Sequence, residues 1–232
     1  IMPGYINSME QSVTQYEVGD IQIHASGFLE NPSLYSSIED SEALLIQLKE
    51  AGISASPRLL GGGLAASGES SAGVSLRAID VESNEQISQL SAKVTKGKWL
   101  DSSDPSGVVL GCKLASNLGV KEGAELVLVS QAKDGSMANG LYTVRGVLGA
   151  VAQSTDRSTV LMTEEAFREL MVFPTGVHQI VLSRGDLSLD EAADVATMIA
   201  EGQDVRTWKQ LMPAVAQMFE LAKVAPFIAS FI

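Results

Sequence analysis

The sequence is poor in the residues that carry most enzyme and metal chemistry. Its 232 residues include one cysteine, Cys112, and two histidines, His24 and His178. A single thiol excludes a disulfide within the chain and cannot build a zinc site. Two histidines without suitably spaced partners do not predict a metal site either. We therefore expect no catalytic residues, no metal and no cofactor in this chain.

Basic and aromatic residues are also scarce. Sixteen lysines and arginines stand against 28 acidic residues, so the formal net charge is −12. A nucleic-acid surface needs clustered basic side chains, and here they are scattered, so no nucleic-acid partner is expected. Aromatics make up 5% of the chain and hydrophobic residues 45%. This composition predicts an aliphatic core, in one large domain or two small ones.

The sequence has one long apolar run, at its C-terminal end. The nine residues after Lys223, VAPFIASFI, contain no charge. About 20 apolar residues are needed to cross a bilayer, so the run by itself is too short. We interpret it as the first half of a membrane span. The alternative is a buried C-terminal helix.

The clearest local pattern lies between Gly107 and Ser130. An apolar run at 108–110 predicts a strand, and 113–118 fits a short helix. Gly119 then stands where a helix ends, because glycine adopts the left-handed conformation without steric cost. Alternation from Glu125 to Val129 predicts a second strand. The unit is structural, because its only reactive side chain is Cys112, which we expect to fill a joint between strand and helix.

Strands and helices alternate before this unit. The alternation over 21–25 predicts a half-exposed strand with His24 on its solvent face. An amphipathic helix is predicted over 38–51, with Gly52 as its stop. Strands are expected at 53–60 and 74–81, and a short helix at 84–93.

After the unit, residues 131–140 form a predicted polar loop with Asp-Gly and Asn-Gly turn formers. Strands are expected at 141–147, 159–162 and 178–183, and helices at 163–171 and 190–200. Thr163 is expected to cap the start of the first of these helices. Ser188 and Glu191 have the spacing of a capping box for the second helix. A short extended segment at 205–208 leads into a last helix from Lys209.

This order predicts an α+β fold in two parts. Residues 14–82 and 176–212 make a discontinuous β-α-β subdomain, and residues 83–175 form a mostly β insert between its halves. Residues 213–232 form an exit helix that leads toward the apolar end of the chain.

The glycine-rich segment 61–73 invites an enzymatic interpretation. It lacks the Gly-Lys-Ser/Thr of a phosphate loop, and Ala72 stands where a nucleophile elbow requires glycine. A serine hydrolase using Ser70 or Ser71 is the enzymatic alternative, with His24 or His178 as the base. We favour a glycine-rich hairpin or edge strand.

Several segments resemble a known family. The pattern G-V-V-L-G-x-x-L-A-x-x-L-G-V-x-x-G at 107–123 is similar to the extracytoplasmic core domain of ABC transporter permeases of the MacB/LolC/LolE/FtsX group. GDIQIHASGFLENP at 19–32, LYTVRGV at 141–147 and Thr207-Trp208 before the last helix agree with it in order and separation. The resemblance covers nearly the whole chain.

The resemblance implies a periplasmic domain of an inner-membrane permease, with a porter-like part and an inserted sabre-like part held between two membrane helices. Such permeases work in pairs, with a second copy or a paralogue, and with a separate cytoplasmic ATPase. They transmit ATP-driven motion to the periplasm, so the domain itself is expected to be no enzyme. One branch releases lipoproteins to a periplasmic carrier, and the MacB branch drives efflux through an adaptor and an outer-membrane channel.

The passage DGSMANGLYTVRG at 134–146 looks like lipoprotein-releasing permeases, so that branch is favoured and efflux is the alternative. In the carrier-gripping permease of that system the loop in the place of 131–140 is longer and contains proline. The candidate partner contacts in the shorter loop here are Lys133, Asp134, Met137 and Asn139. The alternative is an ordinary hairpin loop.

Overall fold

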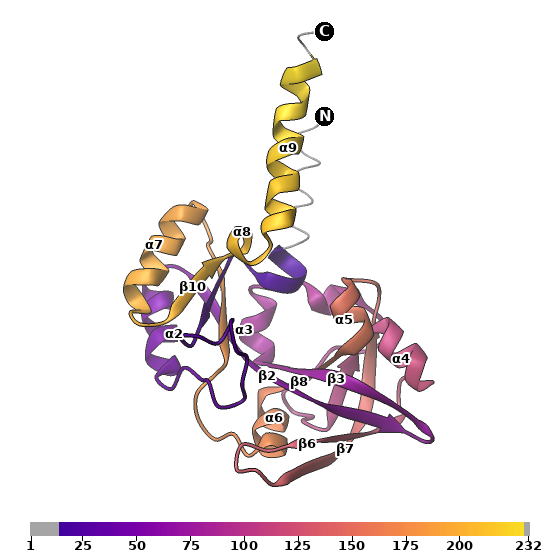
Figure 1. Cartoon of the computed structure of the whole chain (residues 1–232). Helices are drawn as coiled ribbons and strands as arrows, with labels where there is room; N and C mark the ends of the chain where they lie inside the picture. Colours follow the sequence, from indigo (N-terminus) through magenta and orange to yellow (C-terminus); the bar gives the residue numbers. More distant parts are fainter. Residues whose placement is uncertain (1–13, 230–232) are drawn as a thin grey trace.

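A single mixed sheet organises the part of the chain that this computed structural model describes, residues 14–229 (Figure 1). Its ten strands are β1 (Ile21–His24), β2 (Ser54–Ser67), β3 (Ser70–Ile79), β4 (Val94–Gly97), β5 (Gly107–Leu110), β6 (Glu125–Gln131), β7 (Met137–Leu148), β8 (Thr159–Thr163), β9 (Gln179–Ser183) and β10 (Asp204–Thr207).

Short helices connect and cover these strands. They are the π-helix η1 (Thr14–Val18), α2 (Ser41–Glu50), α3 (Val81–Glu85), the 3-10 helix η2 (Leu90–Lys93), α4 (Cys112–Leu118), α5 (Gln153–Ser158), α6 (Glu164–Met171), α7 (Leu189–Ile199), α8 (Trp208–Leu211) and α9 (Pro213–Ala229). The fold is therefore α+β, as predicted.

Six of the strands close into a ring. Going round it, β2 pairs with β3, β3 with β8, β8 with β5, β5 with β7, β7 with β6, and β6 again with β2. The strands β9, β1 and β10 continue the sheet from the first residues of β2. β2 can serve both regions because it is 14 residues long: residues 54–58 pair with β9, and residues 64–66 with β6.

The core is aliphatic and lies on both sides of β5 and β8. Val108 and Leu110 belong to the main cluster, whereas Val109 belongs to a second cluster with Leu161 of β8. All residues of both strands are buried. A strand covered on both faces reads as a continuous apolar run, because neither face needs polar residues. This explains the unbroken VVL run of β5.

The helix-capping predictions are confirmed. Gly119 ends α4 with a φ of 69°, in the left-handed region. Thr163 accepts a hydrogen bond from the N–H of Ala166 at the start of α6. Ser188 and Glu191 form the expected capping box of α7. These local signals succeed because a cap involves only neighbouring residues.

Three predictions about the first half of the chain are wrong. β1 is wholly buried, because α7 packs on it, and His24 is 2% exposed, because the ring of Phe28 stacks on it. The helix predicted over 38–51 begins at Ser41, since Ile38 forms a bridge with Val177. The helix predicted over 84–93 is divided into α3 and η2.

The first and the last strand of the sheet pair with each other close to the base of α9. Ile21 at the start of β1 pairs with Thr207 at the end of β10. The N–H of Trp208 donates to the carbonyl of Asp20 at 2.9 Å. The Trp208 side chain is 1% exposed, and its ring lies 5.7 Å from that of Phe219 on α9. The helix is thus attached to the sheet by its first turns.

The helix α9 extends away from the sheet, on the side opposite to the β6–β7 hairpin (Figure 1). It covers the predicted exit helix as far as Ala229, and residues 230–232 lie outside the described part. Within residues 14–229 no helix has both the length and the apolar character needed to cross a membrane.

The junction of β5 and α4 allows a test of the packing. A Cβ at Gly111 would lie 2.1 Å from the carbonyl oxygen of Thr155 on α5. Because only backbone atoms stand in the way, we expect Gly111→Ala to lower the free energy of unfolding by about 2 kcal/mol or more, measured by urea denaturation. Gly73→Ala is the matched control, because a Cβ there meets nothing within 4 Å. Equal stabilities of the two variants would contradict this packing.

Candidate functional site

The predicted loop 131–140 is a β-hairpin, which corrects the sequence prediction. β6 runs to Gln131 and β7 starts at Met137, so only residues 132–136 form the turn. Asn139, taken as a turn former, pairs with Val129 inside the ladder. The segment looks polar because its outward residues face solvent, while Ala138 points inward and is buried.

The turn of the hairpin is ordered by its own polar groups. The carboxylate of Asp134 accepts hydrogen bonds from the hydroxyl of Ser136 at 2.6 Å and from its N–H at 2.9 Å. These bonds hold the pKa of Asp134 below its usual value. Gly135 has a φ of 84°, in the left-handed region that the turn requires. Asp134 thus shapes the turn and remains exposed at its tip.

Lys133 attaches the hairpin to the rest of the domain. Its N–H donates to the carbonyl of Met171 at 2.8 Å. Its ammonium group lies 4.2 Å from the centre of the Phe173 ring and 4.0 Å from a carboxylate oxygen of Glu39. These contacts turn the side chain toward the segment after α6. The Lys133 side chain therefore helps to pack the hairpin against Phe173 and Glu39.

Met137 and Asn139 belong to a group of outward residues without charge, called the uncharged face below, which ends at the exposed Glu125 of β6. Their neighbours on this uncharged face are Leu64, Ala66, Val127, Val129 and Leu141, which β2, β6 and β7 bring into direct register. Met137 is 78% exposed and Leu141 60%. Exposed apolar groups that cluster mark interaction surfaces. Sequence analysis missed its β2 and β6 members, because the pairing of the strands brings them together.

The four predicted contact residues thus fall into three places. Lys133 turns toward Phe173, Asp134 lies at the tip, and Met137 and Asn139 lie on the uncharged face. Whether they touch a partner stays a prediction.

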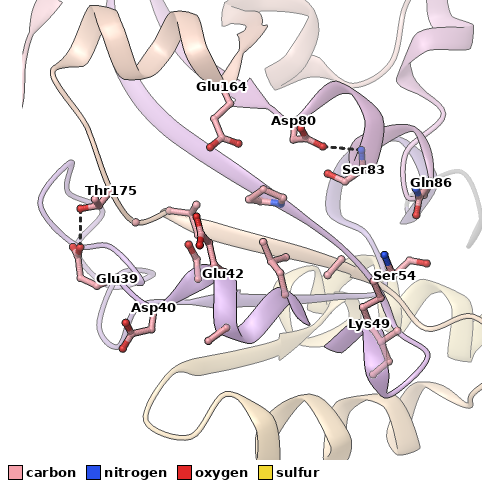
Figure 2. A pocket seen from close by; sticks show the side chains of 18 of the residues that line it. Glu39, Asp40, Glu42, Lys49, Ser54, Asp80, Ser83, Gln86, Glu164 and Thr175 are labelled. Carbon is pink, nitrogen blue, oxygen red and sulfur yellow. Dashed lines mark hydrogen bonds between the residues drawn. The ribbon is translucent and has the colours of Figure 1, made fainter. Parts of the chain in front are cut away.

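A cleft of about 1070 Å³ lies between α2, α3 and the segment that joins α6 to β9 (Figure 2). Its lining includes the acidic residues Glu39, Asp40, Glu42, Asp80 and Glu164, and the basic residues Lys49 and Arg168. Figure 2 shows the carboxylates coming from different elements rather than converging on one point.

Most carboxylates of the cleft have structural partners. Glu39 accepts from the hydroxyls of Ser37 at 2.6 Å and Thr175 at 3.2 Å, and the Ser37 bond is the main reason that its pKa is lowered. Asp80 caps α3 by accepting from the N–H of Ser83. Glu164 pairs with Arg168 one turn along α6. Among the described residues, no three His, Cys, Asp or Glu side chains form a group that could hold a metal ion.

His178 joins three segments of the core. Its Nδ1 accepts from the N–H of Leu60 at 3.0 Å, and its Nε2 lies 3.1 Å from the carbonyl oxygen of Leu34. The ring packs against Phe173, with centroids 4.7 Å apart. Burial is the main cause that lowers the pKa of His178. Because both ring nitrogens have hydrogen-bond partners, this imidazole links the three segments.

His24 belongs to a buried polar cluster close to His178. Its Nε2 lies 3.0 Å from the side-chain oxygen of Gln22, which also accepts from the amide of Gln179 at 2.6 Å. The ring stacks on Phe28, with centroids 5.4 Å apart. Burial lowers the pKa of His24 to about 4, against a smaller opposing effect of Asp204. The residue is therefore neutral at pH 7.

The other residues considered for chemistry lie apart from the histidines. Ser70 is the first residue of β3, directly after the turn of the β2–β3 hairpin, so the glycine-rich segment is the predicted hairpin. In the described part of the chain, neither Ser70 nor Ser71 hydrogen-bonds to an imidazole. Cys112 is a free, half-buried thiol at the first position of α4.

Two solved structures with a similar fold are transporter domains. One is the extracellular domain of the noncanonic ABC-type transporter YknZ from Gram-positive bacteria, with a TM-score of 0.58 and 12% identity over 81% of this chain and 99% of that one. The other is the periplasmic region of MacB from Actinobacillus actinomycetemcomitans, with a TM-score of 0.60 and 14% identity over 91% and 98%. No protein-family model and no curated protein matches the sequence significantly. At these identities the likeness establishes the α+β fold.

The burial of His24 predicts how the free energy of unfolding depends on pH. The pKa of His24 is about 4 in the folded chain and 6.5 in the unfolded one, so only the unfolded state takes up this proton between those values. The free energy of unfolding that the neutral His24 contributes is therefore fully present above about pH 6.5, and it is lost as the pH decreases toward 4. We expect His24 to account for a loss of about 2 kcal/mol between pH 7 and pH 5.

The measurement is urea denaturation at both pH values, for the wild type and for His24→Gln. The variant cannot take up the proton, so its loss between pH 7 and pH 5 is expected to be smaller. His178 remains in both proteins and contributes equally to each. Identical pH profiles would contradict the assignment of the effect to His24.

Proposed function

We propose that this chain is the extracytoplasmic domain of an ABC transporter permease, which passes motion driven by a cytoplasmic ATPase to a partner in the periplasm. The observation that carries the proposal is the fold, which resembles the periplasmic region of MacB and the extracellular domain of YknZ over most of each chain. The residues that resemble the MacB/LolC/LolE/FtsX group, at 107–123 and elsewhere, support it independently.

The attachment of α9 to the sheet fits a mechanical role. Trp208 and Phe219 pack at the base of the helix, and β10 pairs with β1 directly beside them. A tilt or shift of α9 would therefore move the sheet as a body, without bending a flexible connection. In this proposal α9 leads toward an inner-membrane span, and the permease acts with a second copy or a paralogue.

We propose that residues 14–82 and 176–212 form the porter-like part, and residues 83–175 the sabre-like insert. The two parts share the ring, because β2 and β3 pair with β6 and β8. Such pairing would let force applied at β1 and β10 reach the β6–β7 hairpin. The hairpin lies at the end of the molecule opposite to α9 (Figure 1), where a periplasmic partner can reach it.

Within this role we favour release of lipoproteins from the inner membrane to a periplasmic carrier, with Lys133, Asp134, Met137 and Asn139 as contacts. The passage 134–146, which looks like lipoprotein-releasing permeases, supports this choice. The uncharged face next to the hairpin fits an apolar partner surface. MacB-like efflux with an adaptor and an outer-membrane channel is the second candidate, favoured by the fold.

The first experiment tests transmission of motion. In the full-length permease, reconstituted with its ATPase, we expect Phe219→Ala to reduce the lipoprotein released per ATP hydrolysed about ten-fold, while ATP hydrolysis continues. The physical reason is the cavity left at the base of α9, which loosens the helix from the sheet.

Met218→Ala is the matched control, because Met218 is the neighbouring residue on α9 and is 64% exposed. Thermal denaturation verifies that both variants are folded. If the two variants release equal amounts per ATP, α9 does not transmit motion through this contact.

The second experiment identifies the partners. Full-length permease is purified from membranes, and the accompanying proteins are identified by mass spectrometry. An ATPase with lipoproteins or a carrier supports lipoprotein release, whereas an ATPase with an adaptor and an outer-membrane channel supports efflux. Absence of an ATPase would refute the transporter role.

The same purification is made with Met137→Glu, which places a charge on the uncharged face. We expect it to reduce recovery of the periplasmic partner about ten-fold without affecting the ATPase. Met198→Glu is the matched control, because Met198 is a similarly exposed methionine on α7.

A further inference from the structure

Over its first residues, the strand β7 is paired along one edge only. Along 137–143 it pairs with β6. Its other edge pairs with β5, but this ladder begins at Thr143, opposite Gly107. Among the described strands, none covers the β5-side edge of residues 137–142. The first half of β7 is therefore an open sheet edge.

The backbone groups at this edge can be assigned from the hydrogen bonds that follow it. The N–H of Val144 donates to Ala124, on the β6 side, and the N–H of Thr143 donates to Ser106, on the β5 side. In an antiparallel ladder the backbone groups of successive residues alternate between the two edges. The N–H and C=O groups of Met137, Asn139 and Leu141 are thus directed away from β6, toward the open edge.

A groove of about 510 Å³ runs along this edge. Residues 136–142 form one wall, and Pro105, Ser106 and the α6 residues Ala166, Glu169 and Leu170 form much of the rest. Glu169 is the only charged residue in the lining. Its negative charge adds to burial in raising the pKa of Tyr142 to about 12. The groove therefore offers unpaired backbone groups, walls of mixed polar and apolar character, and one negative charge.

The edge lacks the protection that soluble proteins usually give to open strands. Lysine, proline or a bulge normally prevents an edge from pairing with another chain. The sequence MANGL at 137–141 contains neither a charge nor a proline, and its pairing with β6 is regular. An open, regular and uncharged edge next to a groove favours the addition of a strand.

We propose that the edge of β7 accepts an extended, positively charged peptide segment of a partner protein as an additional strand. Met137, Asn139 and Leu141 supply the backbone hydrogen bonds, and Glu169 attracts a basic side chain. This inference rests on the proposed function only in placing the partner at the β6–β7 hairpin. A second copy of this chain is disfavoured as the occupant, because each copy carries a net charge of −12 and would bring its own Glu169.

Amide hydrogen exchange of the chain, followed by NMR, tests the assignment of the backbone groups. Without a ligand, the N–H groups of Asn139 and Leu141 should exchange fast, whereas those of Gly140 and Tyr142 should exchange slowly because they bond to β6. The probe is the peptide Thr-Lys-Val-Lys-Val-Thr, and its binding should slow exchange at Asn139 and Leu141. Protection of both amides in the free monomer would overturn the proposal.

Two control peptides separate the contributions. N-methylation of alternate residues removes the N–H groups that would pair, so it should weaken binding about ten-fold or more. Replacing both lysines by glutamate should weaken binding in low salt, because the charge near Glu169 is then repulsive. Binding that is unaffected by N-methylation would overturn strand addition.

The matched variants are Asn139→Pro and Asn139→Ala. Proline removes the N–H at the open edge, where it does not interrupt the β6 ladder, so Asn139→Pro should bind the peptide about ten-fold more weakly. Asn139→Ala keeps the N–H and should bind as the wild type does. If Asn139→Pro fails to fold, the N-methylated peptide carries the same test.

The outcomes distinguish this inference from the proposed function. Peptide binding is measured without ATPase or membrane, so it can succeed even if no transporter partner is found. Loss of binding in Asn139→Ala as well would assign the contact to the side chain, which keeps the hairpin as a contact and overturns strand addition. Dimerisation that protects Asn139 and Leu141 without peptide would assign the edge to a second copy and overturn the proposal.

Discussion

The architecture depends on the close approach of β2 to β6, which closes the ring of strands. A Cβ at Gly63 would lie 2.6 Å from the carbonyl oxygen of Val129, so the approach requires glycine. Gly61, two residues earlier, leaves room for the ring of Phe167. The glycine-rich segment thus has a steric purpose. Without this closure β6 would be paired on one edge only, and the sheet would connect the β6–β7 hairpin to β2 only by way of β5, β8 and β3.

The two buried histidines help to hold the interior together. His178 joins β9 to Leu60 and Leu34, and His24 forms a buried cluster with Gln22 and Gln179. Arrangements of this kind stiffen a domain, because a buried polar group must keep its partner. Stiffness is what a domain needs if it is to pass motion from α9, at one end, to the hairpin, at the other.

Local signals in the sequence predicted local structure well. Gly119, Thr163 and Ser188 end or begin helices as expected, because caps and left-handed glycines depend only on adjacent residues. The strand predictions failed where burial decided the outcome. His24 alternates with apolar neighbours, yet it is buried because the ring of Phe28 stacks on it and Gln22 and Gln179 pack beside it.

By itself the sequence determined the α+β class, the order of most elements, the helix caps and the family resemblance, since these follow from periodicity and from short motifs. Only the tertiary structure decided how the ring closes, that residues 131–140 belong to a hairpin, and that Leu64, Val127 and Leu141 share one face with Met137. It also decided that the first half of β7 has an open edge. The ring closure and the place of Leu64 beside Met137 arise from pairing between strands far apart in the chain, and register between distant strands leaves no mark in local sequence. The β6–β7 hairpin pairs neighbouring strands, but its turn formers and polar residues made the segment look like a loop.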